Sequence, residues 1–275
     1  MVKLHRKIIQ VISTLITNVN IKGFFEGKIY RGSLKKVCVP GLNCYSCPGA
    51  VGSCPIGSLQ AVIGSAKYRI SYYVFGLLIL FGVTMGRFVC GFLCPFGLVQ
   101  ELLYKVRSKK LSIPRWSKYI KYGVLIVFVV LLPILWVNKV GIGDPAFCKY
   151  ICPAGTLEGG IPLVLTNPAL KESVGALYAW KLGLLVITII ASIIIFRPFC
   201  KVLCPLGAIY GLFNPISFYR YEIDNDKCTS CGKCSKLCKM DVEVYKKPNS
   251  SECIRCGECK DACPAKAIDS GFKGQ

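Results

Sequence analysis

Eight of the eighteen cysteines in this sequence lie near the C-terminus, in two runs that share one spacing. The runs read CTSCGKCSKLC at 228–238 and CIRCGECKDACP at 253–264, and each has the form C-x2-C-x2-C-x3-C. Three closely spaced thiolates can bind three irons of a cubane cluster, whereas the fourth cysteine lies too far round the turn and binds the other cluster. The residue types and their spacing therefore predict two iron–sulfur centres.

The same reasoning assigns ligands to each centre, because this is the spacing of bacterial two-cluster ferredoxins. One 4Fe–4S cluster is expected on Cys228, Cys231, Cys234 and Cys263. The second is expected on Cys253, Cys256, Cys259 and Cys238. Zinc is the alternative, but zinc sites usually combine CxxC pairs that lie further apart.

The other ten cysteines gather around four Cys-Pro-x-Gly units. The units begin at Cys54, Cys94, Cys152 and Cys204, and in the last three another cysteine stands four residues earlier, as in RFVCGFLCPFG at 87–97. At a helix start, proline fits the first helical position because its missing N–H has no intrahelical partner to lose. The positive end of the helix dipole favours a thiolate. Each unit is therefore predicted to supply an anionic sulfur ligand at the start of a half-helix.

The elements that must position these cysteines are apolar. Apolar residues make up 53% of the 275 residues, and the mean hydropathy is positive, which favours a membrane protein over a soluble domain. Ile70–Val89, Tyr119–Val137 and Ala179–Phe196 are long enough to cross a hydrocarbon layer of about 30 Å, and Pro133 should kink the second of them. Lys7–Ile21 is shorter and more polar, and by itself it reads equally well as an interfacial helix.

The order of units and spans indicates an internal repeat. One span separates the first two units, another separates the last two, and Tyr119–Val137 joins the halves. If the halves are equivalent, Lys7–Ile21 becomes a fourth span. We therefore predict a mainly α membrane protein with about four transmembrane helices in two parallel repeats over residues 1–219. A small α+β two-cluster ferredoxin domain should follow over residues 220–275.

Charge predicts the orientation. Residues 1–219 carry 24 Lys and Arg against five acidic residues, whereas residues 220–275 carry eleven against nine. The loop after the first long span is basic, so the positive-inside rule places it and the ferredoxin domain in the cytoplasm; Arg87, near the end of that span, should snorkel to the interface. Residues 22–69 also hold seven basic residues, although four spans would put them outside. A partly buried re-entrant loop would reconcile this positive charge with an outer location.

With four spans, the membrane cysteines divide into two groups. The cytoplasmic-side group would form a site for a further iron–sulfur cluster and consists of Cys90, Cys94, Cys200 and Cys204. The outer group could form another such site and consists of Cys47, Cys54, Cys148 and Cys152, leaving Cys38 and Cys44 spare. Each CxxxC pair is also open to interpretation as a dithiol, a disulfide or a Cu(I) site, because soft thiolates bind Cu(I) readily.

Together these features resemble the polytopic membrane ferredoxins of the NapH, NosR and CcoG type. The resemblance rests on the CxxxCP motifs Cys90–Pro95, Cys148–Pro153 and Cys200–Pro205 and on the two-cluster domain, and it covers most of residues 70–265. It implies electron transfer between a quinone pool or membrane partner and redox proteins elsewhere. The CcoG relatives also imply reduction of copper. The added element CVPGLNCYSCPGAVGSCPIG at 38–57 departs from the family pattern.

The predicted function is that of an iron–sulfur electron carrier of the cytoplasmic membrane. Its expected partners are the lipid membrane and a soluble or membrane redox protein, with quinone as a further candidate. A thiol–disulfide or copper-reducing membrane enzyme is the alternative, and a purely structural ferredoxin anchor is a third reading; the sequence leaves open whether the protein is an enzyme. His5 is the only histidine, which excludes bis-histidine haem, and no recognisable motif points to nucleic acid.

Overall fold

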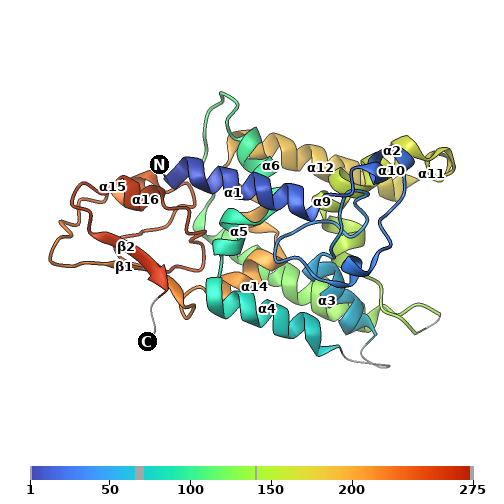
Figure 1. Ribbon diagram of the computed structural model, residues 1–275, viewed down its shortest axis with the longest axis horizontal. Coiled ribbons are helices and arrows are strands. Elements are labelled where there is room, and N and C mark those ends of the chain that lie inside the picture. Colours follow the sequence, from blue (N-terminus) through green and yellow to red (C-terminus); the bar gives the residue numbers. More distant parts are fainter. Residues whose placement is uncertain (1, 66–70, 140, 273–275) are drawn as a thin grey trace.

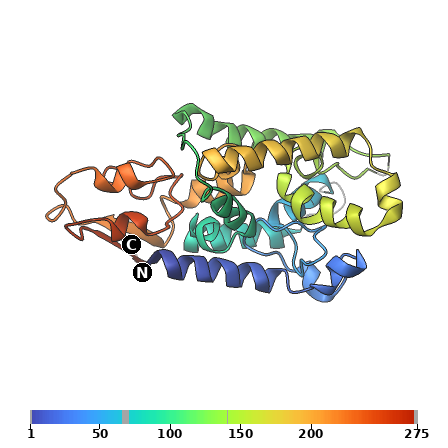
Figure 2. The same ribbon diagram turned by 90° about the horizontal axis from the view of Figure 1, so that it is seen from above.

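Long helical segments run along the long axis of the molecule, and the cysteine-rich C-terminal segment forms one end of it (Figure 1). The computed structural model describes residues 2–65, 71–139 and 141–272. The long segments are α1 (Val2–Thr17), α4 (Tyr72–Met85), the composite Arg115–Leu135 and α12 (Ala176–Ile194). Figure 2 shows the same elongated arrangement from above, with α1 and α12 on different sides of the body.

Two of these segments are long and apolar enough to cross a membrane, namely Arg115–Leu135 and Ala176–Ile194. They match two of the predicted spans, each beginning and ending a few residues earlier. The segments α4, with 14 residues, and α1, with 16, are shorter than a full membrane crossing of about 20 residues. The start of the remaining predicted span, Ile70, lies outside the described residues.

The shortness of α4 has a local cause. Gly86 adopts a φ of 52°, and its amide donates to the carbonyls of Gly82 and Phe81 in a helix-ending arrangement. The chain then turns at Arg87 and resumes as α5 (Phe88–Phe92), the helix that carries Cys90. The predicted continuous span is thus divided so that the cysteine faces the interior.

The composite segment changes its helical geometry ahead of Pro133. It consists of η2 (Arg115–Tyr119), α7 (Ile120–Val124), the π-helix η3 (Leu125–Leu131) and α8 (Leu132–Leu135). A proline ring clashes with the carbonyl four residues earlier in an α-helix, and a π-helical turn moves that carbonyl away. The composite segment therefore continues through Pro133, because the wider π-helical stretch before it accommodates the proline ring.

Half-helices begin at all four Cys-Pro units, as the sequence predicts. They are α3 (Pro55–Gly64), α6 (Pro95–Leu103), α9 (Pro153–Gly155) and α14 (Pro205–Phe213). In each, the cysteine is the N-cap with extended backbone and the proline is the first helical residue. The α9 helix continues through the π-helix η5 (Thr156–Gly160) into α10 (Ile161–Thr166).

The first cysteine of each CxxxCP motif lies on a separate short helical turn. These turns are α5, η4 (Phe147–Ile151) and α13 (Pro198–Val202). The remaining short helices of the body are α2 (Lys22–Glu26), η1 (Ser33–Lys36) and α11 (Pro168–Glu172). Each CxxxCP motif is consequently a helix–turn–helix in which both sulfurs lie near the turn.

The C-terminal segment has the helices and strands of the predicted α+β module. Strand β1 (Tyr219–Ile223) pairs antiparallel with β2 (Ile268–Phe272), so the segment returns to where it started. Between them lie α15 (Lys233–Leu237) and α16 (Glu258–Asp261), each following a glycine in the left-handed region. This arrangement brings the two cysteine runs together inside one small unit (Figure 1).

The outer faces of the long helices are apolar. On α1, Ile12, Leu15 and Ile16 are about half exposed or more, whereas Arg6 and Gln10 are buried. Only 11% of the apolar window in α12 is buried inside the molecule. A helix with polar residues inside and large apolar residues outside is the reverse of a surface helix in water. The pattern indicates that these faces contact lipid.

Candidate iron–sulfur centres

The first predicted ligand set of the C-terminal segment lines one cavity. We call it the distal set; its members are Cys228, Cys231, Cys234 and Cys263. Gly232 takes a φ of 71° at the start of α15, which lets the chain wrap around the cavity. Cys231 is exposed to solvent, and the Lys233 amide lowers its pKa by hydrogen bonding.

The second predicted set lies deeper. We call it the proximal set; its members are Cys253, Cys256, Cys259 and Cys238. Burial raises the pKa of Cys259, and the charges of Cys253, Cys256 and Cys238 raise it further. The influence of Cys238 on the pKa of Cys259 is in keeping with the predicted grouping, which stays a prediction.

The inner set gathers the cysteines of two CxxxCP motifs, and all four are buried. Its members are Cys90, Cys94, Cys200 and Cys204. Burial raises the pKa of Cys94 to about 12, and the charges of Cys200 and Cys90 raise it as well. The Gly97 and Gly207 amides point at the sulfurs of Cys94 and Cys204, each at 3.4 Å. These are amides of the first helical turn, aimed at the sulfur that caps it.

Two fully buried arginines tie the two motifs of the inner set to each other. Arg87, three residues before Cys90, donates from Nη2 to the Cys200 carbonyl at 3.2 Å. Arg197, three residues before Cys200, donates from Nη1 to the Cys90 carbonyl at 2.6 Å. In each motif, the arginine thus donates to the carbonyl of the first cysteine of the other motif. The two guanidinium groups place two positive charges beside the four sulfurs.

The outer cysteines line a cavity of about 150 Å³, which we call the outer cavity. Its cysteines are Cys44, Cys54, Cys148 and Cys152. Three of them belong to the predicted outer group, but the fourth is Cys44 instead of Cys47. The sulfur of Cys47 lies 3.5 Å from Asn18 Oδ1, and the Cys38 sulfur lies 3.3 Å from Ser58 Oγ. Both therefore contact polar side chains that are not part of the cavity lining.

No three Cys, His, Asp or Glu side chains within residues 2–65, 71–139 and 141–272 lie close enough to hold one metal ion. None of the eighteen cysteines, all of which lie in the described residues, forms a disulfide. A single zinc or copper ion needs ligand atoms that converge within about 2.3 Å of one point. A cubane needs no such convergence because each thiolate binds a different iron. The distal set and the outer cysteines each line one cavity, an arrangement that fits the second requirement.

The proximal set is packed against the inner set. Arg87 donates from Nη1 to the Ser251 carbonyl at 2.8 Å and to the Glu252 carboxylate at 2.9 Å, just before Cys253. A Cβ atom on Gly91, next to Cys90, would lie 2.3 Å from the carbonyl oxygen of Ile254. The backbones that carry the two sets are therefore in direct contact, and Gly91 is what allows the approach.

Comparison with known proteins identifies 4Fe–4S binding domains in this chain. A family described as "4Fe-4S binding domain" matches residues 70–114, 122–161 and 177–218, and a second family with the same description matches residues 247–269. An uncharacterized protein of Methanocaldococcus jannaschii is 31% identical over 80% of this chain and 86% of its own length. The ferredoxin-type protein NapH of Haemophilus influenzae is 28% identical over 62% of this chain. The chain belongs to the NapH-type family of 4Fe–4S ferredoxins.

Matches to the named relatives of this NapH-type ferredoxin are partial. The methylamine utilization ferredoxin-type protein MauN of Methylorubrum extorquens is 28% identical over 68% of this chain. The chain spans about half the length of MauN and of NapH, at 55% and 54%. No solved structure matches the chain.

Buried ion pairs fix the half-helices of this NapH-type ferredoxin, and sequence reasoning missed them. Glu101 on α6 binds Arg6 of α1 through both oxygens, at 2.7 and 2.8 Å, and lies 2.7 Å from Arg197. Burial alone would raise the pKa of Glu101, but Arg197 and Arg6 hold it below its ordinary value. Glu252 is likewise paired with Arg87 and Lys121. The sequence does contain one sign of these pairs: an arginine stands three residues before Cys90 and another stands three residues before Cys200.

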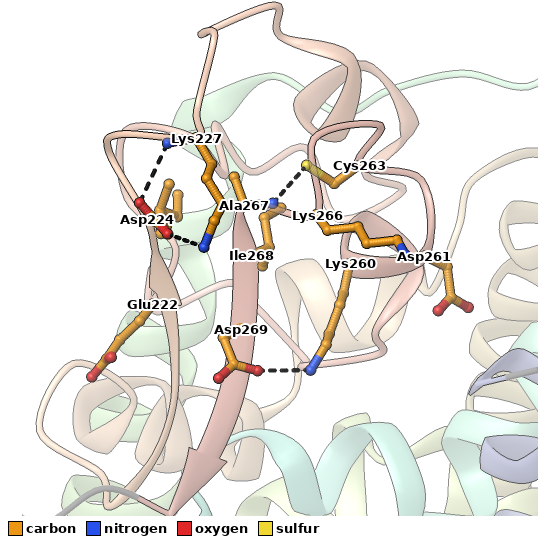
Figure 3. Close-up of a pocket in the computed structure, with 11 residues that line it drawn as sticks. Glu222, Asp224, Lys227, Lys260, Asp261, Cys263, Lys266, Ala267, Ile268 and Asp269 are labelled. Carbon is orange, nitrogen blue, oxygen red and sulfur yellow. Dashed lines mark hydrogen bonds and ion pairs between the residues drawn. The ribbon is translucent and has the colours of Figure 1, made fainter.

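The distal set of this ferredoxin borders a surface hollow of about 690 Å³. Figure 3 shows Lys227 paired with Asp224 and Lys260 paired with Asp269 at its rim. The Ala267 amide points at the sulfur of Cys263, at 3.4 Å. The hollow thus opens to solvent beside one ligand of the distal set.

Proposed function

We propose that this protein is a membrane-bound electron carrier in which three ligand sets connect a soluble redox partner with the interior of the membrane domain. When bound, 4Fe–4S clusters exchange single electrons at potentials set by nearby charges, hydrogen bonds and solvent. The chain's own residues supply four thiols to each set, aim backbone amides at several of the sulfurs and exclude water in a graded way. Iron–sulfur electron transfer is also the role that its ferredoxin-type relatives support.

The order of the sets follows from solvent exposure and contact. The distal set includes the exposed Cys231 and borders the charged hollow, so it is the natural contact point for a soluble partner. The proximal set has two buried and two half-buried cysteines. The inner set is buried throughout and lies against the half-helices. Exposure falls in the order that a path from solvent into the membrane requires.

The observation that carries the proposal is the contact between Gly91 and Ile254. These residues directly follow Cys90 and Cys253, members of the inner and proximal sets. A tethered ferredoxin with no electron path onward would need no such backbone contact between cysteine-bearing loops.

We further propose that the C-terminal segment faces the cytoplasm, because the basic loop before Arg115 precedes a span and lies on that side.

Metal content of a single variant tests the proposal. Cys200→Ala removes one ligand of the inner set and leaves the distal and proximal sets intact. Purified in detergent, it should retain the iron and acid-labile sulfide of the C-terminal segment and lose about four irons per chain. An iron content equal to that of the parent protein would show that the inner cysteines hold no cluster, and would favour dithiol or copper chemistry at these residues.

A further inference from the structure

We propose a second membrane 4Fe–4S cluster, held in the outer cavity, whose half-helices α3 and α9 lie away from the C-terminal segment (Figure 1). Its ligands are Cys44, Cys54, Cys148 and Cys152. The proposed function above needs only the distal, proximal and inner sets, so this site adds to it. The thiols come from four places: a loop, the N-caps of α3 and α9, and the turn η4.

The outer cavity repeats the hydrogen bonding of the inner set. Gln100, six residues after Cys94, donates from Nε2 to the Cys200 sulfur at 3.2 Å. Gln60, six residues after Cys54, donates from Nε2 to the Cys148 sulfur at 3.1 Å. In both cases an amide on a Cys-Pro half-helix reaches the first sulfur of the facing CxxxCP motif. Amide donors of this kind stabilise the negative charge of a sulfur bound to metal.

The glycines of the two outer units face sulfur across the cavity. A Cβ atom on Gly57 would lie 3.8 Å from the Cys148 sulfur, and one on Gly155 would lie 3.7 Å from the Cys44 sulfur. The inner glycines, Gly97 and Gly207, instead face the guanidinium groups of Arg197 and Arg87, at 3.1 and 3.2 Å. Lys181 Nζ would also lie 3.9 Å from the Cβ atom on Gly155, so a sulfur and one lysine face the outer glycine where a guanidinium faces the inner ones.

The donor set indicates what occupies this space. Four thiols surround about 150 Å³, and no three of them converge on a point within the described part of the chain. The distal and proximal sets, whose spacing is that of cubane ligands, share this property. Separate thiolates around a common volume bind a multi-iron cluster, whereas a lone soft ion requires convergence.

Charge distinguishes the two membrane sites. The inner set has two buried arginines paired with Glu252 and Glu101, and because these carboxylates also pair with Lys121 and Arg6, positive charge stays in excess there. The outer cavity has Lys181, which donates to the Cys148 carbonyl at 3.1 Å. It also has Glu158, whose carboxyl group accepts from the Cys44 amide at 2.7 Å. Positive charge favours the reduced, more negative form of a cluster, and the effect is large in a low dielectric. The outer cluster should therefore have the lower reduction potential of the two.

A pair of cysteine variants tests the site. Cys148→Ala should lose about four irons per chain and one low-potential signal in an electron paramagnetic resonance titration. Cys47→Ala is the matched control, because Cys47 is buried in the same region but does not line the outer cavity. It should keep both. Unchanged iron in Cys148→Ala, or an equal loss in Cys47→Ala, would overturn the assignment, while the Cys200→Ala result independently reports on the inner set.

A charge variant keeps the test decisive if Cys148→Ala does not accumulate. Lys181→Met retains every cysteine and removes the cation beside Cys148. One cluster potential should shift to lower values while the others stay where they are in the parent protein. A titration in which no potential moves would contradict a cluster in the outer cavity.

Discussion

Arg87 shows how burial overrides a local interpretation of a residue. Its position at the end of an apolar stretch predicts snorkelling to the interface, yet its side chain is fully buried. The reason is Glu252, which lies far away in the sequence and supplies the carboxylate that a buried guanidinium needs. Arg197 and Glu101 form the corresponding pair. No local pattern announces these partners, because each pair joins separate parts of the chain.

Cys44 and Cys47 illustrate the same limit for the ligands. The four-residue spacing of the other motifs works because their first cysteine lies on a helical turn. Before Cys54 the chain is not helical, and it folds back through a bridge between Cys38 and Ser53. Sequence spacing therefore could not tell which cysteine enters the outer cavity. The eight C-terminal cysteines are different, since the spacing alone predicts their grouping.

The first residue-scale prediction concerns Glu101. Glu101→Gln would leave Arg6 and Arg197 buried without their carboxylate, which should cost about 3–5 kcal/mol of stability. The expected result is a clearly lower thermal midpoint in detergent, with Glu172→Gln, at an exposed position of α11, as the control. Because the pKa of Glu101 is held below its ordinary 4.5, this stabilisation is present at neutral pH and is lost only as the pH falls through the lowered pKa. Equal midpoints for the two variants at pH 7 would refute the role of Glu101.

Helix starts were the most predictable elements. Each depends on neighbouring residues alone, namely an extended cysteine as N-cap followed by proline at the first position. Helix ends were less predictable: α4 stops at Gly86 because of a positive φ that hydropathy does not reveal. The π-helical stretch before Pro133 was partly predictable, since proline predicts that the helix is disturbed but does not specify whether it kinks, ends or widens.

At the element scale, the contact of α5 with the C-terminal segment can be tested at Gly91. Gly91→Ala places a methyl group 2.3 Å from the Ile254 carbonyl oxygen, so the two loops must separate. All clusters should assemble, but electron transfer between the C-terminal segment and the inner set should slow by a measurable factor in stopped-flow reduction. Gly76→Ala on α4, where a Cβ would meet nothing within 4 Å, is the matched control. Identical rates for both variants would remove Gly91 from the electron path.

The whole molecule is organised by polarity and by depth. Apolar side chains cover the outside of the long helices, whereas the ion pairs of Glu101 and Glu252 and the cysteines of the inner set are buried. Two helices have the length and composition of membrane spans, and the sequence predicted both because an apolar run of about 20 residues is typical of a transmembrane helix. The shorter α1 and α4 flank the same body and also expose apolar side chains, but neither reaches the length of a full crossing.

The most direct test of the account is the iron and acid-labile sulfide content of the intact protein, purified anaerobically in detergent. Four occupied ligand sets predict about sixteen irons per chain, with about eight in the C-terminal segment and the rest at the membrane cysteines. A value near eight, with the cysteines of the inner set and the outer cavity freely alkylated, would contradict the central claim that thiols from separate half-helices hold clusters within the membrane domain.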